Sequence, residues 1–278
     1  KDGKTLAFIS TDRGHKSATL RVADAASGKV RDVYTETVAT QYQSAPALGS
    51  VAWRYLPESN EFLWFSQKSN WGHLYLHDLS TGKEKHPLTR GDWNATKIGY
   101  LDQASRTLWF SGVGREPGDP YFVHYYKVGL DGGAVQLLTP EDANHSITPS
   151  EDGKYFVDVY SKIDTAPVAV IRDGNGKQVK ELAHADLTRL KAAGWVAPES
   201  FTVKARDGKT DIYGQLFKPS HFDAKKKYPI ITYIYPGPQV GSIRSRSFAP
   251  AHGDHQALAE LGFIVIAVDG MGTPLRSK

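Results

Sequence analysis

The chain has 278 residues, of which 40% are hydrophobic, so it is long enough for one large domain or two ordinary ones with a proper core. Its formal net charge of +4 is spread along the sequence without basic blocks, which argues against a nucleic-acid-binding protein. The absence of cysteine excludes disulfides and thiol nucleophiles within these residues. The sequence contains no apolar run of about 18 residues, which is the length that a membrane-spanning helix needs. The sequence opens without Met or a cleavable leader, so we expect an upstream portion. The compartment stays open, with a periplasmic or secreted location favoured.

Residues 1 to about 180 show short strands and turns and no convincing helix. Four apolar segments, spaced about 50 residues apart, share one form, because each follows a polar turn and precedes a second strand. These segments begin at Leu6, Phe62, Leu108 and Tyr155. Three of the second strands run into turns that start with Asp and close with Gly-Lys, at residues 24–29, 78–83 and 173–177. A repeat of this length with several strands per unit predicts a β-propeller.

A β-sandwich is the alternative, since it also contains many short strands. The same turn chemistry at the same place in each unit favours the propeller. Four units are few for a closed ring. We therefore expect the sequence to be a fragment whose ring is completed by residues outside it.

The pattern changes near residue 184. Asp186–Ala193 predicts a single helix with Asp186 as its N-cap, and Trp195–Glu199 then resembles a linker. The sequence thus predicts two domains, the last blades of a propeller over 1–195 and a second domain over 196–278.

The second domain opens with two alternating strands, Ser200–Lys204 and Asp211–Lys218. Asp207-Gly208 lies between them, and this dipeptide is a strong hairpin signal. We therefore expect an antiparallel pair at the start of this domain.

A strand–helix–strand unit follows the hairpin. Tyr228–Tyr235 predicts a buried strand that ends in the rigid turn Pro236-Gly237-Pro238, and Phe263–Val268 predicts a second strand. His255–Leu261 between them has helix-forming composition, so the unit reads as a parallel crossover. Such units place catalytic groups at the carboxyl ends of their strands, where Tyr235 lies. A hairpin that leads into a parallel sheet is how an α/β-hydrolase domain begins.

The motifs of the second domain occur in an order that resembles a known family. They are Phe201-Thr202-Val203-Lys204, Gly214-Gln215-Leu216-Phe217, Lys227-Tyr228-Pro229, Tyr235-Pro236-Gly237-Pro238 and Asp269-Gly270-Met271-Gly272-Thr273. Together they resemble the start of the hydrolase domain in the prolyl oligopeptidase family of serine peptidases. Segments such as Gly72-His73-Leu74-Tyr75 and Leu88-Thr89-Arg90-Gly91-Asp92-Trp93 are similar to propeller sequences of its dipeptidyl peptidase IV branch. One departure is Met271, where the family usually has Arg.

The resemblance implies a fold and an activity. The fold is a partial β-propeller followed by the N-terminal part of an α/β-hydrolase domain. The parent protein would be a serine exopeptidase that releases N-terminal dipeptides, with Pro or Ala preferred at the second position, through an acyl-enzyme and without metal or cofactor. The residue that matches Tyr235 stabilises the oxyanion in that branch, so Tyr235 is the one catalytic residue expected here. The expected partners are a peptide substrate and a second copy of the protein, with no nucleic acid.

The triad of that family is expected downstream. No Gly-x-Ser-x-Gly occurs in the sequence, and the Ser, Asp and His of this fold would follow residue 278. We therefore expect the given chain alone to be inactive. Two alternatives stay open for the parent, namely another peptidase of the family (an oligopeptidase or acylaminoacyl peptidase) and a non-catalytic propeller that binds other proteins.

Weaker candidates have simpler explanations. His252 and His255 lack a third metal ligand in the sequence, so surface or capping roles are favoured. Arg244 and Arg246 could reach a substrate carbonyl, but a solvated loop is the favoured interpretation. A group of four aromatic residues is interpreted as core: Tyr121, Phe122, Tyr125 and Tyr126.

Overall fold

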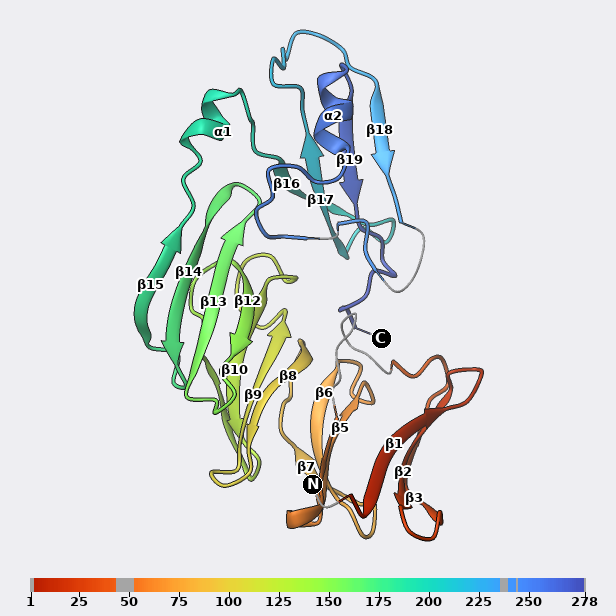
Figure 1. Ribbon diagram of the computed structural model, residues 1–278. Coiled ribbons are helices and arrows are strands. Elements are labelled where there is room, and N and C mark those ends of the chain that lie inside the picture. Colours follow the sequence, from red (N-terminus) through yellow and green to blue (C-terminus); the bar gives the residue numbers. More distant parts are fainter. Residues whose placement is uncertain (1–2, 44–52, 236–239, 244, 278) are drawn as a thin grey trace. The chain divides into compact units, whose positions relative to one another are not determined.

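The computed structural model describes residues 3–43, 53–235, 240–243 and 245–277. These residues form five β-sheets (Figure 1). The chain divides into two compact units. One contains the residues up to Arg115 together with Tyr126–Gln136, and the other contains Glu116–Tyr125 and Leu137–Arg276. The predicted domain boundary after Trp195 stays a prediction.

The first three sheets are each formed by consecutive strands in chain order. The first contains β1 (Thr5–Thr11), β2 (Ser17–Asp24) and β3 (Val30–Thr37). The second contains β4 (Arg54–Leu56), β5 (Glu61–Ser66), β6 (His73–Asp78) and β7 (Glu84–Pro87), with the 3₁₀ turn η1 (Pro57–Ser59) after β4. The third contains β8 (Asn94–Asp102), β9 (Thr107–Val113), β10 (Val123–Gly129) and β11 (Gly132–Leu137).

The fourth sheet repeats this plan and the fifth departs from it. The fourth contains β12 (Asn144–Pro149), β13 (Tyr155–Lys162), β14 (Thr165–Asp173) and β15 (Gln178–His184), all paired antiparallel. The fifth has the strand order β16-β17-β19-β18, so its strands do not follow the order of the chain. Its elements, after α1 (Thr188–Ala192), are β16 (Glu199–Lys204), β17 (Asp211–Phe217), β18 (Ile230–Tyr233), α2 (His255–Glu260) and β19 (Ile264–Val268). Separate sheets of consecutive strands are consistent with the predicted propeller.

The recurring Asp-to-Lys turns join the last two strands of their sheets, and the structure shows why their residues recur. In the turn after β6, the Asp78 carboxylate accepts a hydrogen bond from the Thr81 backbone N–H (2.8 Å). Gly82 adopts a φ of 71°, which glycine tolerates best, and the Asp78 N–H donates to the Lys83 carbonyl (2.8 Å). The turns that follow β2 and β14 close in the same way, through Asp24 and Asp173.

Aromatic and aliphatic side chains fill the core of the first unit. Leu20 from β2 packs with Phe62 and Trp64 from β5, and all three are fully buried. The indole of Trp64 donates to the buried carboxylate of Glu36 (2.6 Å), so its one polar atom is satisfied. Of the predicted aromatic core residues, Tyr126 is buried in this unit and Tyr121, Phe122 and Tyr125 are buried in the second unit, which confirms that interpretation.

An ion-pair network joins the second and third sheets within the first unit. Glu61 on β5 is 3% exposed at its side chain and pairs with Lys85 (2.6 Å) and Arg106 (2.9 Å). Arg106 in turn pairs with Asp131 in the turn before β11 (2.7 Å). Burial alone would raise the pKa of the Glu61 carboxyl, but hydrogen bonds from Arg106 and Lys85 outweigh it and lower this pKa to about 2.

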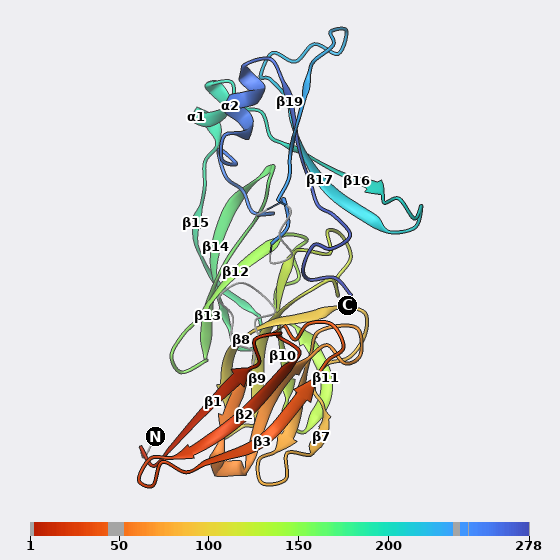
Figure 2. The ribbon, with the colours of Figure 1, turned by 90° about the vertical axis from the view of Figure 1, so that its right-hand side faces the viewer.

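The fifth sheet confirms the predicted hairpin and the predicted parallel unit. β16 and β17 pair antiparallel and extend side by side as a hairpin (Figure 2). β18 and β19 pair parallel, with Tyr233 opposite Ala267. Phe217, Ala259 and Val265 form the core between the sheet and α2.

Two local predictions are wrong. The strand that was expected to be buried, β18, is an edge strand with alternating exposed and half-buried residues, and Ile230 is 61% exposed. The reason is that β18 pairs only with β19 among the described strands. The helix α1 has Leu187 as its N-cap in place of Asp186, although the Asp186 carboxylate accepts the backbone N–H of Thr188 (2.8 Å), the first residue of the helix.

Candidate active site

The carboxyl ends of β18 and β19 define the candidate site. Tyr235 lies two residues beyond the end of β18, and Asp269 directly follows β19. Because the two strands are parallel and in register, both residues leave the sheet at the same edge. The predicted rigid turn Pro236-Gly237-Pro238 lies outside the described residues.

The backbone of Tyr235 is held by a hydrogen bond, and its side chain is exposed to solvent. Its N–H donates to the hydroxyl oxygen of Ser242 (3.0 Å), and Ser242 is 7% exposed. The Tyr235 side chain is 39% exposed, and its hydroxyl makes no hydrogen bond to any of the described residues. A phenol held in this way can donate a hydrogen bond to a bound molecule.

Asp269 is a buried carboxylate that organises the loop after Tyr235. One oxygen accepts the Ile243 backbone N–H (3.1 Å), and the other accepts a guanidinium N–H of Arg246 (2.9 Å). The loop packs closely against this carboxylate, since a Cβ on Gly241 would lie 2.4 Å from its Oδ1. Its side chain is fully buried, so the paired cation is needed to stabilise its charge.

Arg246 is enclosed, so the prediction that it lies in a solvated loop is wrong. Its side chain is 10% exposed, and its guanidinium lies 4.2 Å from the ring centroid of Tyr121. Nε lies 3.5 Å from the Asp119 carboxylate, and Nη1 donates to the Ile243 carbonyl (3.1 Å). Its predicted companion Arg244 lies outside the described residues.

Sequence reasoning did not connect Asp119 and Tyr121 with this site. They lie in the loop between β9 and β10, more than a hundred residues before Arg246, and no local pattern marks the pairing. Burial raises the pKa of the Tyr121 phenol, and the neighbouring cations oppose this effect. Its hydroxyl accepts a hydrogen bond from Arg276 (3.2 Å), which in turn donates to the Asp211 carbonyl (3.0 Å).

The two histidines do not form a metal site with the described residues. His252 and His255 both pack against the ring of Phe217, with centroids 5.6 and 5.0 Å away. Neither belongs to a group of three ligand-type residues in the described part of the chain. Burial lowers the pKa of the His252 imidazole, which favours its neutral form.

One group of ligand-type residues does meet metal-site spacing: Glu141, His145 and Asp158. An arginine already supplies the cation there, because Arg172 pairs with Asp158 (2.9 Å) and with Glu141 (2.6 Å). His145 lies 2.8 Å from Asp158 through Nδ1 and 3.1 Å from the Glu141 carbonyl through Nε2. The group is therefore explained as a buried ion-pair network of the fourth sheet.

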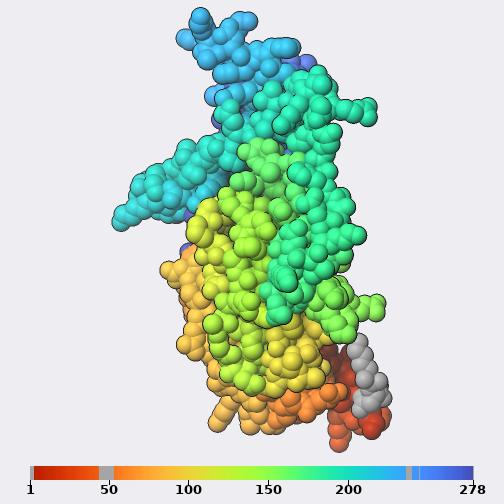
Figure 3. All heavy atoms as spheres, turned by 90° about the vertical axis from the view of Figure 1, so that its left-hand side faces the viewer, coloured from red at the N-terminus to blue at the C-terminus, as the bar shows by residue number. Residues whose placement is uncertain are grey.

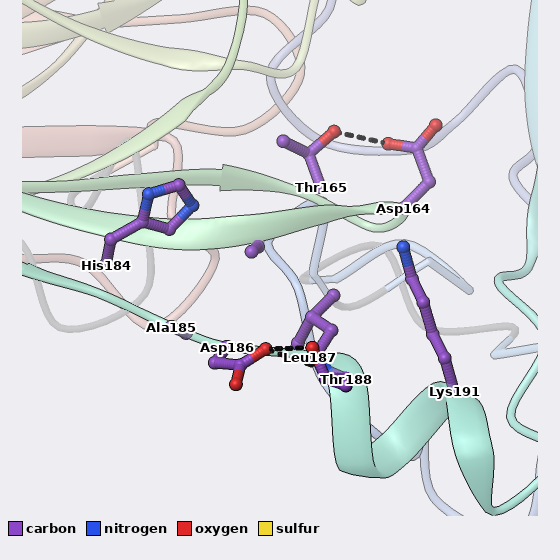
Figure 4. A pocket seen from close by; sticks show the side chains of 9 residues that line it. Asp164, Thr165, His184, Ala185, Asp186, Leu187, Thr188 and Lys191 are labelled. Atoms are coloured by element: carbon purple, nitrogen blue, oxygen red, sulfur yellow. Dashed lines mark hydrogen bonds between the residues drawn. The ribbon is translucent and has the colours of Figure 1, made fainter.

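One depression has a lining that does not include Tyr235. It measures about 560 Å³ and is lined by the loop before β14, the end of β15 and α1 (Figure 4). Two of its carboxylates pair locally, Asp164 with Thr165 (2.9 Å) and Asp186 with Thr188 (2.6 Å). β15 beside it is exposed along its whole length, and its atoms lie at the surface in Figure 3.

Comparison with known proteins identifies the class of protein that this fold and site define. Residues 1–167, more than half of the chain, match the family model described as the dipeptidyl peptidase IV N-terminal region. The chain therefore belongs to the dipeptidyl peptidase IV family.

Individual relatives agree with this family. Human dipeptidyl peptidase 8 is 28% identical over 207 residues, which are 69% of this chain and 22% of the relative. Dipeptidyl peptidase 4 of Arthroderma otae is 27% identical over 227 residues, 77% of this chain and 28% of the relative. The chain thus spans about a quarter of the length of these curated relatives.

Solved structures extend the similarity to the whole chain. A Bacteroides ovatus protein provisionally named dipeptidyl aminopeptidase IV has a TM-score of 0.84 at 26% identity, covering 100% of this chain and 41% of that one. Porphyromonas gingivalis dipeptidyl peptidase 4 has a TM-score of 0.80 at 21% identity, covering 99% and 38%, and supports the fold alone. Among the described residues, no helix is long and apolar enough to cross a membrane.

Proposed function

We propose that this chain is part of a serine exopeptidase that releases N-terminal dipeptides, with Pro or Ala preferred at the second position. Membership of the dipeptidyl peptidase IV family supports the peptidase class. The proposed architecture is a propeller followed by the start of an α/β-hydrolase domain, which the parallel unit of β18, α2 and β19 supports. The Ser, Asp and His of the catalytic triad would come from residues outside this sequence. A peptide substrate and a second copy of the protein are the proposed partners.

One observation carries the proposal for this chain's own contribution. Tyr235 lies at the carboxyl edge of a parallel strand pair, with its backbone hydrogen-bonded and its hydroxyl without a partner among the described residues. In acyl transfer, negative charge develops on the substrate carbonyl oxygen, and a fixed donor that faces this charge lowers the barrier. Tyr235 would supply that donor.

The test uses the full-length protein and the substrate Gly-Pro-p-nitroanilide. Tyr235→Phe is expected to lower kcat about 100- to 1,000-fold while KM changes less than about threefold, because the donor acts on charge that exists only in the transition state. Tyr233→Phe is the matched control, since Tyr233 lies on β18 itself and its ring packs against His255 (4.6 Å). An unchanged kcat in Tyr235→Phe would refute the oxyanion role.

The substrate class is tested separately. Release of p-nitroaniline from Gly-Pro-p-nitroanilide, together with no release from its N-acetylated form, would support an exopeptidase that requires a free amino terminus. Cleavage of the acetylated form alone would instead indicate an acylaminoacyl peptidase. Cleavage of longer blocked peptides would indicate an oligopeptidase.

A further inference from the structure

Ile243 and Arg246, in the loop that follows Tyr235, both hydrogen-bond to the buried carboxylate of Asp269. We propose that Arg246, together with Asp269, is a positioning residue that holds Tyr235 in place for catalysis. This inference rests on the proposed oxyanion role of Tyr235. It assigns a function to an ion pair that does not itself touch the reacting atoms.

Asp269 and Arg246 close a ring of polar contacts around one residue of the loop. The Ile243 N–H donates to Asp269 (3.1 Å), and the Ile243 carbonyl accepts from Arg246 (3.1 Å). Arg246 donates to the second oxygen of Asp269 (2.9 Å), which completes the ring. Both backbone polar groups of Ile243 are therefore held by charged partners, and such hydrogen bonds are stronger than neutral ones.

This ring of hydrogen bonds is connected to Tyr235 through Ser242, the residue next to Ile243. Ser242 precedes Ile243 and presents its hydroxyl oxygen to the Tyr235 N–H at 3.0 Å. Ser242 and Ile243 are 7% and 6% exposed, so neither can move without disturbing its neighbours. Displacement of Ile243 would therefore shift Ser242 and with it the backbone that carries the Tyr235 phenol.

The guanidinium of Arg246 also contacts the loop before β10. Tyr121 offers its ring face at 4.2 Å, and the Asp119 carboxylate lies 3.5 Å from Nε. A planar guanidinium can stack on a ring and bond to a carboxylate and a carbonyl together, whereas a lysine ammonium cannot. Arginine is thus the residue type that this position requires, and Arg246→Lys is not expected to restore the function.

The energetic consequence appears in catalysis more than in substrate binding. A displacement of about 1 Å of a catalytic group can cost about 100-fold in rate, because the donor then misses the developing charge. Arg246→Met keeps the length and packing of the side chain and removes its charge. Its effect on kcat should depend on the presence of the Tyr235 hydroxyl.

The experiment is a double-mutant cycle in the full-length protein, assayed with Gly-Pro-p-nitroanilide. Arg246→Met is expected to lower kcat about 10- to 100-fold with KM within about threefold. In a Tyr235→Phe background, the same substitution should lower kcat by no more than about threefold, because the positioned hydroxyl is already absent. Arg31→Met is the control, since Arg31 donates to the Leu79 carbonyl (3.3 Å) and shares no hydrogen bond with the candidate site among the described residues, so its kcat should stay unchanged.

The outcomes separate the two proposals. If Tyr235→Phe is slow but Arg246→Met retains kcat, or if the two losses multiply, the positioning role is refuted and the oxyanion role stands. If Tyr235→Phe retains kcat, both are refuted. Should Arg246→Met fail to fold, Ser242→Ala decides, because it removes only the acceptor for the Tyr235 N–H. It is expected to lower kcat about threefold to tenfold in the native background and not in Tyr235→Phe.

Discussion

Glu61→Gln should destabilise the protein in a way that depends on pH. The side chain of Glu61 is 3% exposed and receives hydrogen bonds from Lys85 (2.6 Å) and from two nitrogens of Arg106 (2.9 and 3.2 Å). Its pKa is about 2 in the folded protein, against an ordinary value of 4.5. That difference corresponds to roughly 3 kcal/mol of stability at neutral pH. The partners are partly exposed, so we expect a measured loss of about 1.5–3 kcal/mol.

The sign follows from the lowered pKa of the folded state. The carboxylate stabilises the folded protein at pH values above 4.5, and this contribution is lost as the pH falls toward 2. Urea unfolding of the native protein and of Glu61→Gln between pH 7 and pH 2 should therefore give curves that converge on acidification. Asp32→Asn is the matched control, because its ion pair with Arg21 (2.8 Å) is exposed on both sides. A difference for Glu61→Gln that stays constant with pH would refute the reasoning.

Two further substitutions test the interior and the turns by urea unfolding. Arg172→Met should lower the free energy of unfolding by about 3–5 kcal/mol, because it leaves the carboxylates of Asp158 and Glu141 without their cation. A loss below about 1 kcal/mol would contradict the stabilising role of these two ion pairs. Gly82→Ala should destabilise by more than Gly28→Ala. Both glycines have a φ near 70°, which costs about 1 kcal/mol for alanine, but only at Gly82 would the new Cβ meet a backbone oxygen 2.3 Å away. Equal losses at the two glycines would contradict this packing argument.

The predictable part of the fold is the part that local chemistry determines. The turn at Asp78 could be read from its sequence because the carboxylate, the positive φ of Gly82 and the closing Lys83 all act within six residues. The parallel pair of β18 and β19 was predictable for a similar reason, since a short helix between two apolar runs permits few other arrangements. Tyr235 followed from that topology together with the family resemblance.

The burial of individual residues was less predictable because it depends on distant partners. The apolar run around Ile231 suggested a buried strand, yet a strand that pairs on one side only leaves part of that surface exposed. Arg246 shows the opposite error. A sequence rich in Ser and Arg resembles a solvated loop, but Asp119 and Asp269 make burial of this arginine favourable.

The enclosure of Arg246 also explains a feature of the compact units. Glu116–Tyr125 runs from the loop after β9 into the first three residues of β10, and it groups with the later part of the chain. Tyr121 packs on Tyr213 (5.8 Å) and on the guanidinium of Arg246, and Val123 and Tyr125 donate to Asn144 and Thr139, so this segment contacts residues that follow it in the chain. The proposed support of Tyr235 therefore includes the β9–β10 loop. It follows that substitution of Tyr121 should alter kcat through Arg246, even though Tyr121 belongs to the sequence region that was predicted as propeller.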